Sequence, residues 1–401
     1  MASQLELPQE LVAKIVSEFR NDIPTLRTCA LISREFLPWS RLYLFSSVRL
    51  TGRNVYAFRG VVASSPAVAM YVRRLDMPMM ASLPASALLP PESMAQLPNV
   101  TQLSAHCDPF GFRHLSPAQH RLLADATRQL TTVHLLIDRL WSLPEWAALL
   151  NGCAALTELA IHAESTGWSV QDVALQMPVA PPEDTPRLRA LRISGDCKIL
   201  GPLSAWLVPS GFLDALHTLA IDVLYLQNDY DAPDRRPPIV LAGAASLQVL
   251  TLHLDPPMTL SSGAGATPTC LASFPLLHTL HLKDGPDASI AASLRWLGDF
   301  LHAPLPLPTG TLSDLDIATS ALEYISIDHS MIRRDLLDVP PLTWRALEAP
   351  LLAAPRLRAL TFKGYEKYSI AGAPDAFAHF SSTVRERLAG LEARGVLRTL
   401  Q

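Results

Sequence analysis

Few residues of this chain are spaced for catalysis, phosphate binding or metal binding. Gly263 and Gly265 lie in the segment SSGAGATPT, but no lysine follows them, so the segment lacks the cation of a phosphate-binding P-loop. His278 and His281 are three residues apart, and on a β-strand this odd spacing places them on opposite faces, where they cannot share a metal ion. The chain contains neither a G-x-S-x-G nucleophile motif nor an H-E-x-x-H zinc motif. We therefore expect a protein with no enzymatic activity, no metal and no cofactor.

The cysteines give no sign of a disulfide framework or a zinc site. They are five in number, lie far apart and form no C-x-x-C pair: Cys29, Cys107, Cys153, Cys197 and Cys270. We expect reduced thiols, most of them buried. Glu6 and Glu10 stand where a secretory signal would need a basic start and an apolar run. We therefore expect an intracellular protein, either cytoplasmic or nuclear.

Charge and hydropathy argue against two classes of partner. The net charge is −4 and no block of like charge stands out, so nothing favours binding to nucleic acid or to an anionic membrane. The stretch 237–254 carries no charge, but prolines and polar residues interrupt it, and its ending is typical of a buried strand rather than a membrane span. With 49% apolar and 17% charged residues, the chain has ample material for a core.

One short phrase recurs along most of the chain: an apolar residue, two others, an apolar residue, one other, and an apolar residue. Examples are LTELAI, LRALRI and LHTLHL. The middle apolar residues, which we call the anchors, are Leu75, Leu103, Val133, Leu159, Leu191, Leu219, Leu250, Leu280, Ile325 and Leu360. They recur about every 30 residues, with a wider interval between Leu280 and Ile325. A near-constant step with period-2 alternation inside each phrase indicates a solenoid with one strand per step.

Helix signals lie between several of these phrases. Ser116 and Pro117 suit the start of a helix, and Asp287 can cap another; the segments 144–150 and 341–352 have similar patterns. One strand and one helix per step predict an α/β solenoid, with a parallel sheet inside a curve and helices outside. Over residues 70–400 this pattern resembles leucine-rich repeats, although the asparagine that the family places five residues after the anchor is missing. We expect an irregular leucine-rich-repeat horseshoe over residues 75–401, closed by a capping helix that carries Phe377, Phe380, Val384, Leu388 and Leu391.

The residues between the anchors should face the open side of the predicted sheet, where repeat proteins bind their partners. We expect this face to bind a protein substrate. Its candidate residues are Glu158, His162, Arg192, Asp222, His253, His281, Lys283, Tyr324, Asp328 and Lys363, with His134 earlier in the chain. A solvated sheet face without a ligand is the alternative.

The N-terminus is different in character from the repeats. Leu7, Leu11 and Ile15 recur at four-residue spacing and Phe19 continues the stripe, as one face of a helix requires. A second helix should follow Pro24 and end or kink at Pro38, and a third should follow it. Three short helices in about 50 residues cannot bury all of this apolar surface. A partner, or the following domain, should cover the excess.

These residues resemble an F-box. The family pattern is a Leu-Pro start, an apolar helix and a Leu…Cys…Ser-Arg-x-Phe segment, found here over residues 4–50 as Leu7-Pro8, Glu10-Leu11, Ile15, Leu26, Cys29, Leu31, Ser33-Arg34 and Phe36, with Phe45 in place of the late tryptophan. The resemblance implies an F-box at residues 1–50 that binds the adaptor subunit of a Skp–cullin–F-box (SCF) ubiquitin ligase and, through it, a cullin. The adaptor-facing residues that it implies are Leu7, Pro8, Leu11, Ile15, Leu26, Leu31 and Phe36.

Residues 51–74 should form a helical linker, with a helix, a Ser-Ser-Pro break and a lead into the first repeat strand. The succession of F-box, linker and degenerate repeats resembles the large F-box families of mushroom-forming fungi. It implies a substrate-receptor subunit, tethered by its F-box, whose repeats bind a protein target. Two alternatives remain: the first helices only cap the repeats, or the chain is a protein-interaction scaffold with no ubiquitin-ligase role.

Overall fold

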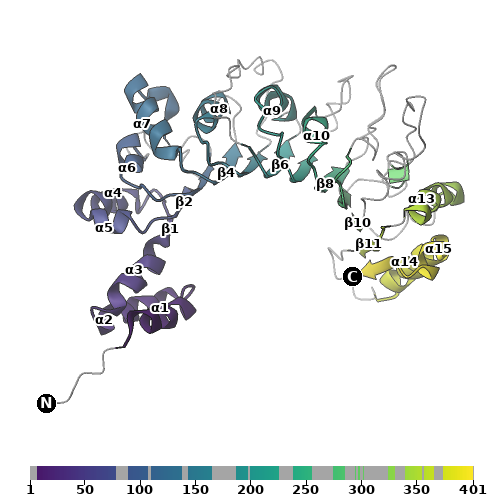
Figure 1. Ribbon diagram of the computed structural model, residues 1–401, viewed down its shortest axis with the longest axis horizontal. Coiled ribbons are helices and arrows are strands. Elements are labelled where there is room, and N and C mark those ends of the chain that lie inside the picture. Colours follow the sequence, from purple (N-terminus) through teal and green to yellow (C-terminus); the bar gives the residue numbers. More distant parts are fainter. Residues whose placement is uncertain are drawn as a thin grey trace. The chain divides into compact units, whose positions relative to one another are not determined.

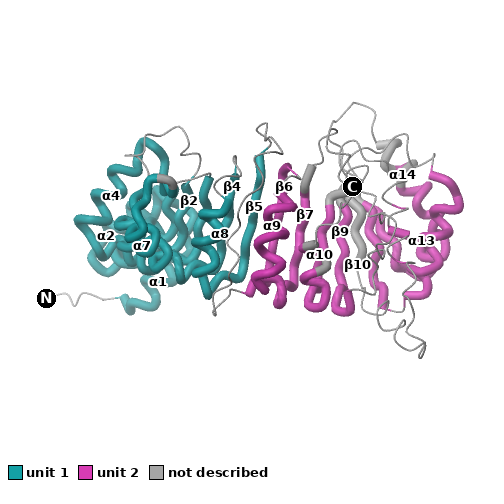
Figure 2. Tube along the Cα trace, turned by 90° about the horizontal axis from the view of Figure 1, so that it is seen from above, with its two compact units in different colours: residues 1–186 teal, residues 187–401 magenta. Residues whose placement is uncertain are grey.

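The computed structural model describes most of the chain. The described residues are 7–77, 89–106, 110–137, 143–164, 187–196, 199–224, 238–254, 274–284, 294, 297–298, 301, 324–329, 339–354, 356–364 and 374–400. They fall into two compact units, residues 1–186 and residues 187–401, which Figure 2 draws in different colours. The two units are described separately below.

Unit 1 begins with three short helices, as the sequence predicts: α1 (Gln9–Glu18), α2 (Ile23–Ile32) and α3 (Phe36–Ser46). Asp22 caps α2, because its carboxylate accepts hydrogen bonds from the Thr25 hydroxyl at 2.6 Å and the Thr25 amide at 3.2 Å. The same two hydrogen bonds lower the pKa of Asp22. The second helix ends at Ile32, so the prediction that Pro38 ends it was wrong. Pro38 instead lies in the first turn of α3, where the missing N–H leaves no helical hydrogen bond unmade.

The three helices share a small core of their own. Val12, Val16 and Leu26 are buried, and Phe36 and Trp39 are among the partly buried side chains that pack on them. This core is small for a folding unit of this length, and chains so short are marginally stable.

The boundary that we predicted at residue 50 passes just beyond a strand of the sheet. Strand β1 (Ser47–Arg49) pairs in parallel with β2 (Arg74–Met77), and the Leu50 amide donates to the Asp76 carbonyl at 2.7 Å. Residues 47–50 therefore belong to the repeat array. The linker has the predicted form, with helix α4 (Val55–Ser64), a break at Ser65 and the short helix α5 (Pro66–Ala69).

The remaining strands of unit 1 are β3 (Gln102–His106), β4 (Thr132–Ile137) and β5 (Glu158–Ala163). Each pairs in parallel with the strand before it, and the register aligns the anchors Leu75, Leu103, Val133 and Leu159, all of which are buried. Between the strands lie α6 (Pro91–Ala95), a 3-10 helix (Phe112–His114), α7 (Pro117–Thr127) and α8 (Leu143–Asn151). These helices follow one side of the strands (Figure 1). Unit 1 thus has the predicted order of one strand and one helical segment per step.

Unit 2 continues the same alternation. Its described strands are all parallel: β6 (Ala190–Asp196), β7 (Thr218–Leu224), β8 (Val249–Leu254), β9 (Thr279–Asp284), β10 (Tyr324–His329), β11 (Ala359–Gly364) and β12 (Leu397–Leu400). Its helices include α9 (Leu200–Leu207), α10 (Pro238–Ala242), α13 (Pro341–Ala353), α14 (Pro374–Arg387) and α15 (Ala389–Ala393). The parallel sheet with helices between its strands is the predicted α/β solenoid-like architecture.

Three details at the end of unit 2 differ from the prediction or lie outside the described residues. The predicted capping helix is two helices, α14 and α15, and a further strand, β12, follows them. Of the helix predicted after Asp287, only a few residues are described, and among them Leu294 and Leu297 are helical and buried.

Backbone hydrogen bonds connect successive repeats at the start of their strands. The Thr101 carbonyl accepts from the amides of Thr131 at 2.8 Å and Thr132 at 3.2 Å, and the Thr131 carbonyl accepts likewise from Thr157 and Glu158. The hydroxyls of Thr131 and Thr157 also donate to these two carbonyls, each at 3.1 Å. The same paired arrangement recurs in unit 2 at the carbonyls of Arg189, His217 and Gln248. In these described steps, the backbone just before one strand is therefore hydrogen-bonded to the backbone at the start of the next strand.

Two charged side chains, Glu348 and Arg394, stabilise the C-terminal helices through hydrogen bonds to backbone groups. One Glu348 carboxylate oxygen accepts from the Gly390 amide at 2.7 Å and from the Leu391 amide at 3.4 Å, near the start of α15. The Arg394 guanidinium donates to the carbonyls of Leu351 at 3.3 Å and Ala354 at 2.8 Å, at the end of α13. In both cases a charged side chain forms hydrogen bonds with backbone N–H or C=O groups that have no partner within their own helix.

The described cysteines fit the expectation of buried thiols, since Cys29 and Cys153 are both free and buried. Cys107, Cys197 and Cys270 lie outside the described residues. The Cys153 thiol donates to the Thr127 carbonyl at 3.3 Å, and burial raises the pKa of Cys153 from 9.0 to about 12.

The raised pKa of Cys153 predicts a loss of stability in alkali. The unfolded chain releases the thiol proton near pH 9.0, whereas the folded chain holds it until about pH 12. The contribution is therefore complete below pH 9 and is lost as the pH rises through this window, by about 1.4 kcal/mol per pH unit. Urea unfolding from pH 8 to pH 10.5 should show a steeper fall for the natural chain than for Cys153→Ala. Parallel pH profiles of the two proteins would contradict the prediction.

Candidate protein-binding surfaces

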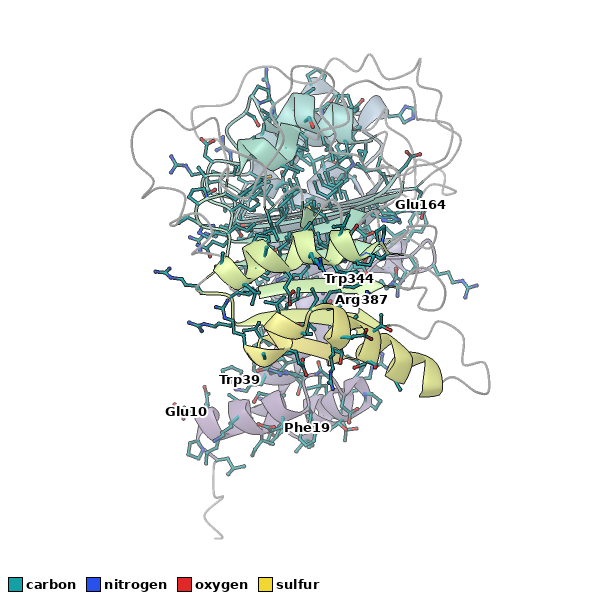
Figure 3. The ribbon with its side chains drawn as sticks, turned by 90° about the vertical axis from the view of Figure 1, so that its right-hand side faces the viewer. Glu10, Phe19, Trp39, Glu164, Trp344 and Arg387 are labelled. Atoms are coloured by element: carbon teal, nitrogen blue, oxygen red, sulfur yellow. The ribbon has the colours of Figure 1, made fainter. Side chains whose placement is uncertain are left out.

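Seven large apolar side chains are exposed on or next to helices α1 and α2. On α1 and just before it, Leu7, Leu11, Ile15 and Phe19 are exposed, while Val12 and Val16 face the small core. Figure 3 labels Phe19 and Glu10 on this segment. On α2, Ile23, Leu31 and Ile32 are exposed, and Leu31 is the most open of them at 87%. Leu7, Leu11, Ile15 and Phe19 recur at four-residue spacing along one side of α1, and we call these four residues the apolar helix face. Large apolar side chains gathered on one surface typically mark an interaction site.

Most of the predicted adaptor-facing residues are exposed in the structure, and one is buried. Leu7, Pro8, Leu11, Ile15 and Leu31 are exposed. Leu26 is 0% exposed and lies in the core of the three helices, so the prediction that it forms part of the surface was wrong. Phe36 is half-buried and packs on that core.

Three exposed apolar residues were absent from the predicted set. Phe19 continues the four-residue spacing of Leu11 and Ile15, and this spacing was a sufficient signal. Ile23 and Ile32, at the two ends of α2, carried no such signal. The helix ends lie outside the packed middle of α2, which is why both side chains remain exposed.

The second candidate surface is the face of each sheet opposite the anchors. In β5, Leu159, Ile161 and Ala163 are buried, whereas Glu158 and His162 alternate with them and are exposed. His134 on β4 is exposed in the same way. The predicted orientation of these three residues is therefore confirmed.

In unit 2 the described side chains follow the same alternation. Arg192 is exposed, and Asp222 and His281 are half-buried, each next to a buried anchor-side residue. The backbone register places His253, Lys283, Asp328 and Lys363 beside one another on successive strands, and Tyr324 lies at the start of β10. The side chains of these last five residues lie outside what the structure describes.

The sequence analysis missed the charged residues at the first two strands. Arg49 on β1 and Arg74 on β2 are exposed, and Arg49 forms an ion pair with Asp76 at 3.7 Å. The signal was present, since the phrase VRRLDM carries Arg74 and Asp76 at the positions that alternate with Leu75 and Met77.

Neither a metal site nor a membrane span is found within the described ranges. No group of three or more His, Cys, Asp or Glu side chains in these ranges is placed to hold a metal ion. Among the helices that the structure describes, none combines the length and the apolar character needed to cross a bilayer.

Comparisons with known proteins give no family for the chain. No protein-family model matches it, and no curated protein matches it. Among solved structures, it is similar to a chain from the crystal structure of the Rad7 and Elc1 complex in yeast, with a TM-score of 0.34 and 12% identity, over 92% of this chain and 97% of that chain. A likeness of this size carries no argument about function, so the architecture rests on the strand register and burial described above.

Proposed function

We propose that this protein is the substrate-receptor subunit of an SCF-type ubiquitin ligase. In this proposal the N-terminal helices bind the adaptor subunit, the adaptor binds a cullin, and the exposed sheet face holds a protein target. The chain itself breaks and forms no bonds. Its contribution is to raise the effective concentration of the target near the catalytic subunits.

The observation that supports the proposal most directly is the exposed apolar helix face. Its four side chains, together with Ile23, Leu31 and Ile32 on α2, remain open to solvent although the chain has a repeat domain that could have covered them. Helices that only capped the repeats would bury this face against the neighbouring strands. The order of residues over 4–50 that resembles an F-box supplies the expected partner, the adaptor subunit of an SCF ubiquitin ligase.

Mixing the purified full-length chain with a purified SCF adaptor subunit tests the proposal. We expect a stable one-to-one complex in size-exclusion chromatography with light scattering, since apolar interfaces of this kind bury enough area for tight binding. A chain that stays monomeric with the adaptor at micromolar concentrations would instead favour a protein-interaction scaffold without a ligase role.

A further inference from the structure

The exposed face of the unit 1 sheet is polar along one row and oppositely charged at its two ends. The register aligns Ser47, Arg74, Gln102, Thr132 and Glu158 on successive strands from β1 to β5. Arg74, Gln102 and Glu158 are exposed, and Thr132 is half-buried. From Arg74 to Glu158 the row therefore runs from a cation to an anion, with the uncharged hydrogen-bonding side chains of Gln102 and Thr132 between them.

Arg49 reinforces the positive charge beside Arg74. At the basic end, Arg49 is 70% exposed, and its ion pair with Asp76 at 3.7 Å is a weak surface contact. Within the described residues, Arg74 has no ion-pair partner. Glu158 alone supplies the charge at the acidic end, because the exposed Glu164, labelled in Figure 3, follows the other end of β5, about 20 Å along the strand. The other titratable groups on this face are His134 and His162, both exposed, and the buried His106.

The spacing of the two charged ends fits a short extended peptide. Arg74 and Glu158 are three strands apart, a separation of about 14 Å at the usual distance between strands. An extended chain covers that distance in about four residues. Gln102, Ser104 and Thr132 between the two ends can pair with the N–H and C=O groups of a peptide backbone. An amphipathic helix would need an apolar groove, and the described positions of this face on β2 and β3 carry no large exposed apolar side chain.

We propose that this face binds an extended protein segment with one acidic and one basic side chain about four residues apart. The carboxylate lies at Arg74 and Arg49, and the cation lies at Glu158. The inference rests on the proposed function, because it names the chemistry of the target segment that the receptor would hold. Opposite charges at fixed positions select both the spacing and the direction of the segment.

The test uses the full-length chain and labelled synthetic peptides of about ten residues, each with one aspartate and one lysine in a serine, threonine and glycine background. The two charges are placed two, four or eight positions apart, in both orders. In fluorescence anisotropy at low ionic strength, we expect the tightest binding at a spacing of four in one order, and about tenfold weaker binding in the other order. The double variant Arg74→Glu/Glu158→Arg should prefer the opposite order.

Both substituted residues are exposed, so the double variant should keep its circular dichroism spectrum. Arg121→Glu, an exposed change of the same kind on helix α7, is the matched control and should bind like the natural chain. Binding that is independent of spacing, an unchanged order preference in the double variant, or no binding up to about 1 mM peptide would overturn the proposal. Preferential binding of a single-stranded oligonucleotide, lost in Arg74→Glu, would also overturn it.

The adaptor experiment separates this inference from the proposed function. A chain that binds the adaptor but does not discriminate between the peptides contradicts only the inference. A chain that discriminates between the peptides but does not bind the adaptor contradicts only the receptor role.

Discussion

Replacing both Leu11 and Ile15 with alanine should weaken binding to the adaptor subunit by about a hundredfold, with the chain still folded. Leu11 is 49% exposed and Ile15 is 41% exposed. An adaptor that covers α1 would bury this remaining apolar surface. Completing the burial of both is worth about 3 kcal/mol, which corresponds to roughly two orders of magnitude in Kd. Isothermal titration calorimetry with the purified adaptor measures the change.

The control for this experiment lies on the same helix. Lys14→Ala and Glu18→Ala shorten exposed side chains of α1 without removing large apolar surface, so we expect affinities within a few-fold of the natural chain. Equal affinities for the control and the double variant Leu11→Ala/Ile15→Ala would show that the adaptor does not bind this face, and the receptor role would then lose its main support.

Two strands show where the repeating phrase is a sufficient signal and where it is not. Phe45, Val48 and Leu50 fit the phrase as well as any later repeat, and the register aligns Val48 with the anchor Leu75. Strand β1 could therefore have been predicted, but the F-box resemblance led us to place these residues in the F-box, at residues 1–50. Strand β12 could not, because Leu397 aligns with the anchor Leu360 while Arg394, three residues earlier, is polar. Arg394 instead caps α13, a role that only the tertiary structure reveals.

The residues of the candidate surfaces could be predicted only in part from the sequence. A sequence motif does not distinguish residues that face the core from residues that face a partner. Leu26 and Leu31 are five positions apart on α2, which places them about 140° apart around the helix axis, so one flat surface cannot hold both. Burial of Leu26 beside Val12 and Val16 assigns that side of α2 to the core. The charge of the sheet face at β1 and β2 was missed because the predicted sites began only at the third repeat phrase, with His134.

Leu26→Ala should therefore reduce stability, whereas Leu31→Ala should reduce only adaptor binding, although both remove the same atoms from the same helix. Leu26 is 0% exposed, and its truncation should destabilise the three helices by about 2–5 kcal/mol, enough to unfold a core of this size. Leu31 is 87% exposed, so its truncation should leave stability unchanged and weaken only adaptor binding. Hydrogen exchange of α1–α3 in the full-length chain measures the first effect, and calorimetry with the adaptor measures the second. If instead Leu31→Ala accelerated exchange as much as Leu26→Ala, the exposed leucine would be part of the fold rather than a contact for a partner. The repeats give an internal reference, because exchange in β3 and β4 should not change in either variant when the three helices unfold on their own.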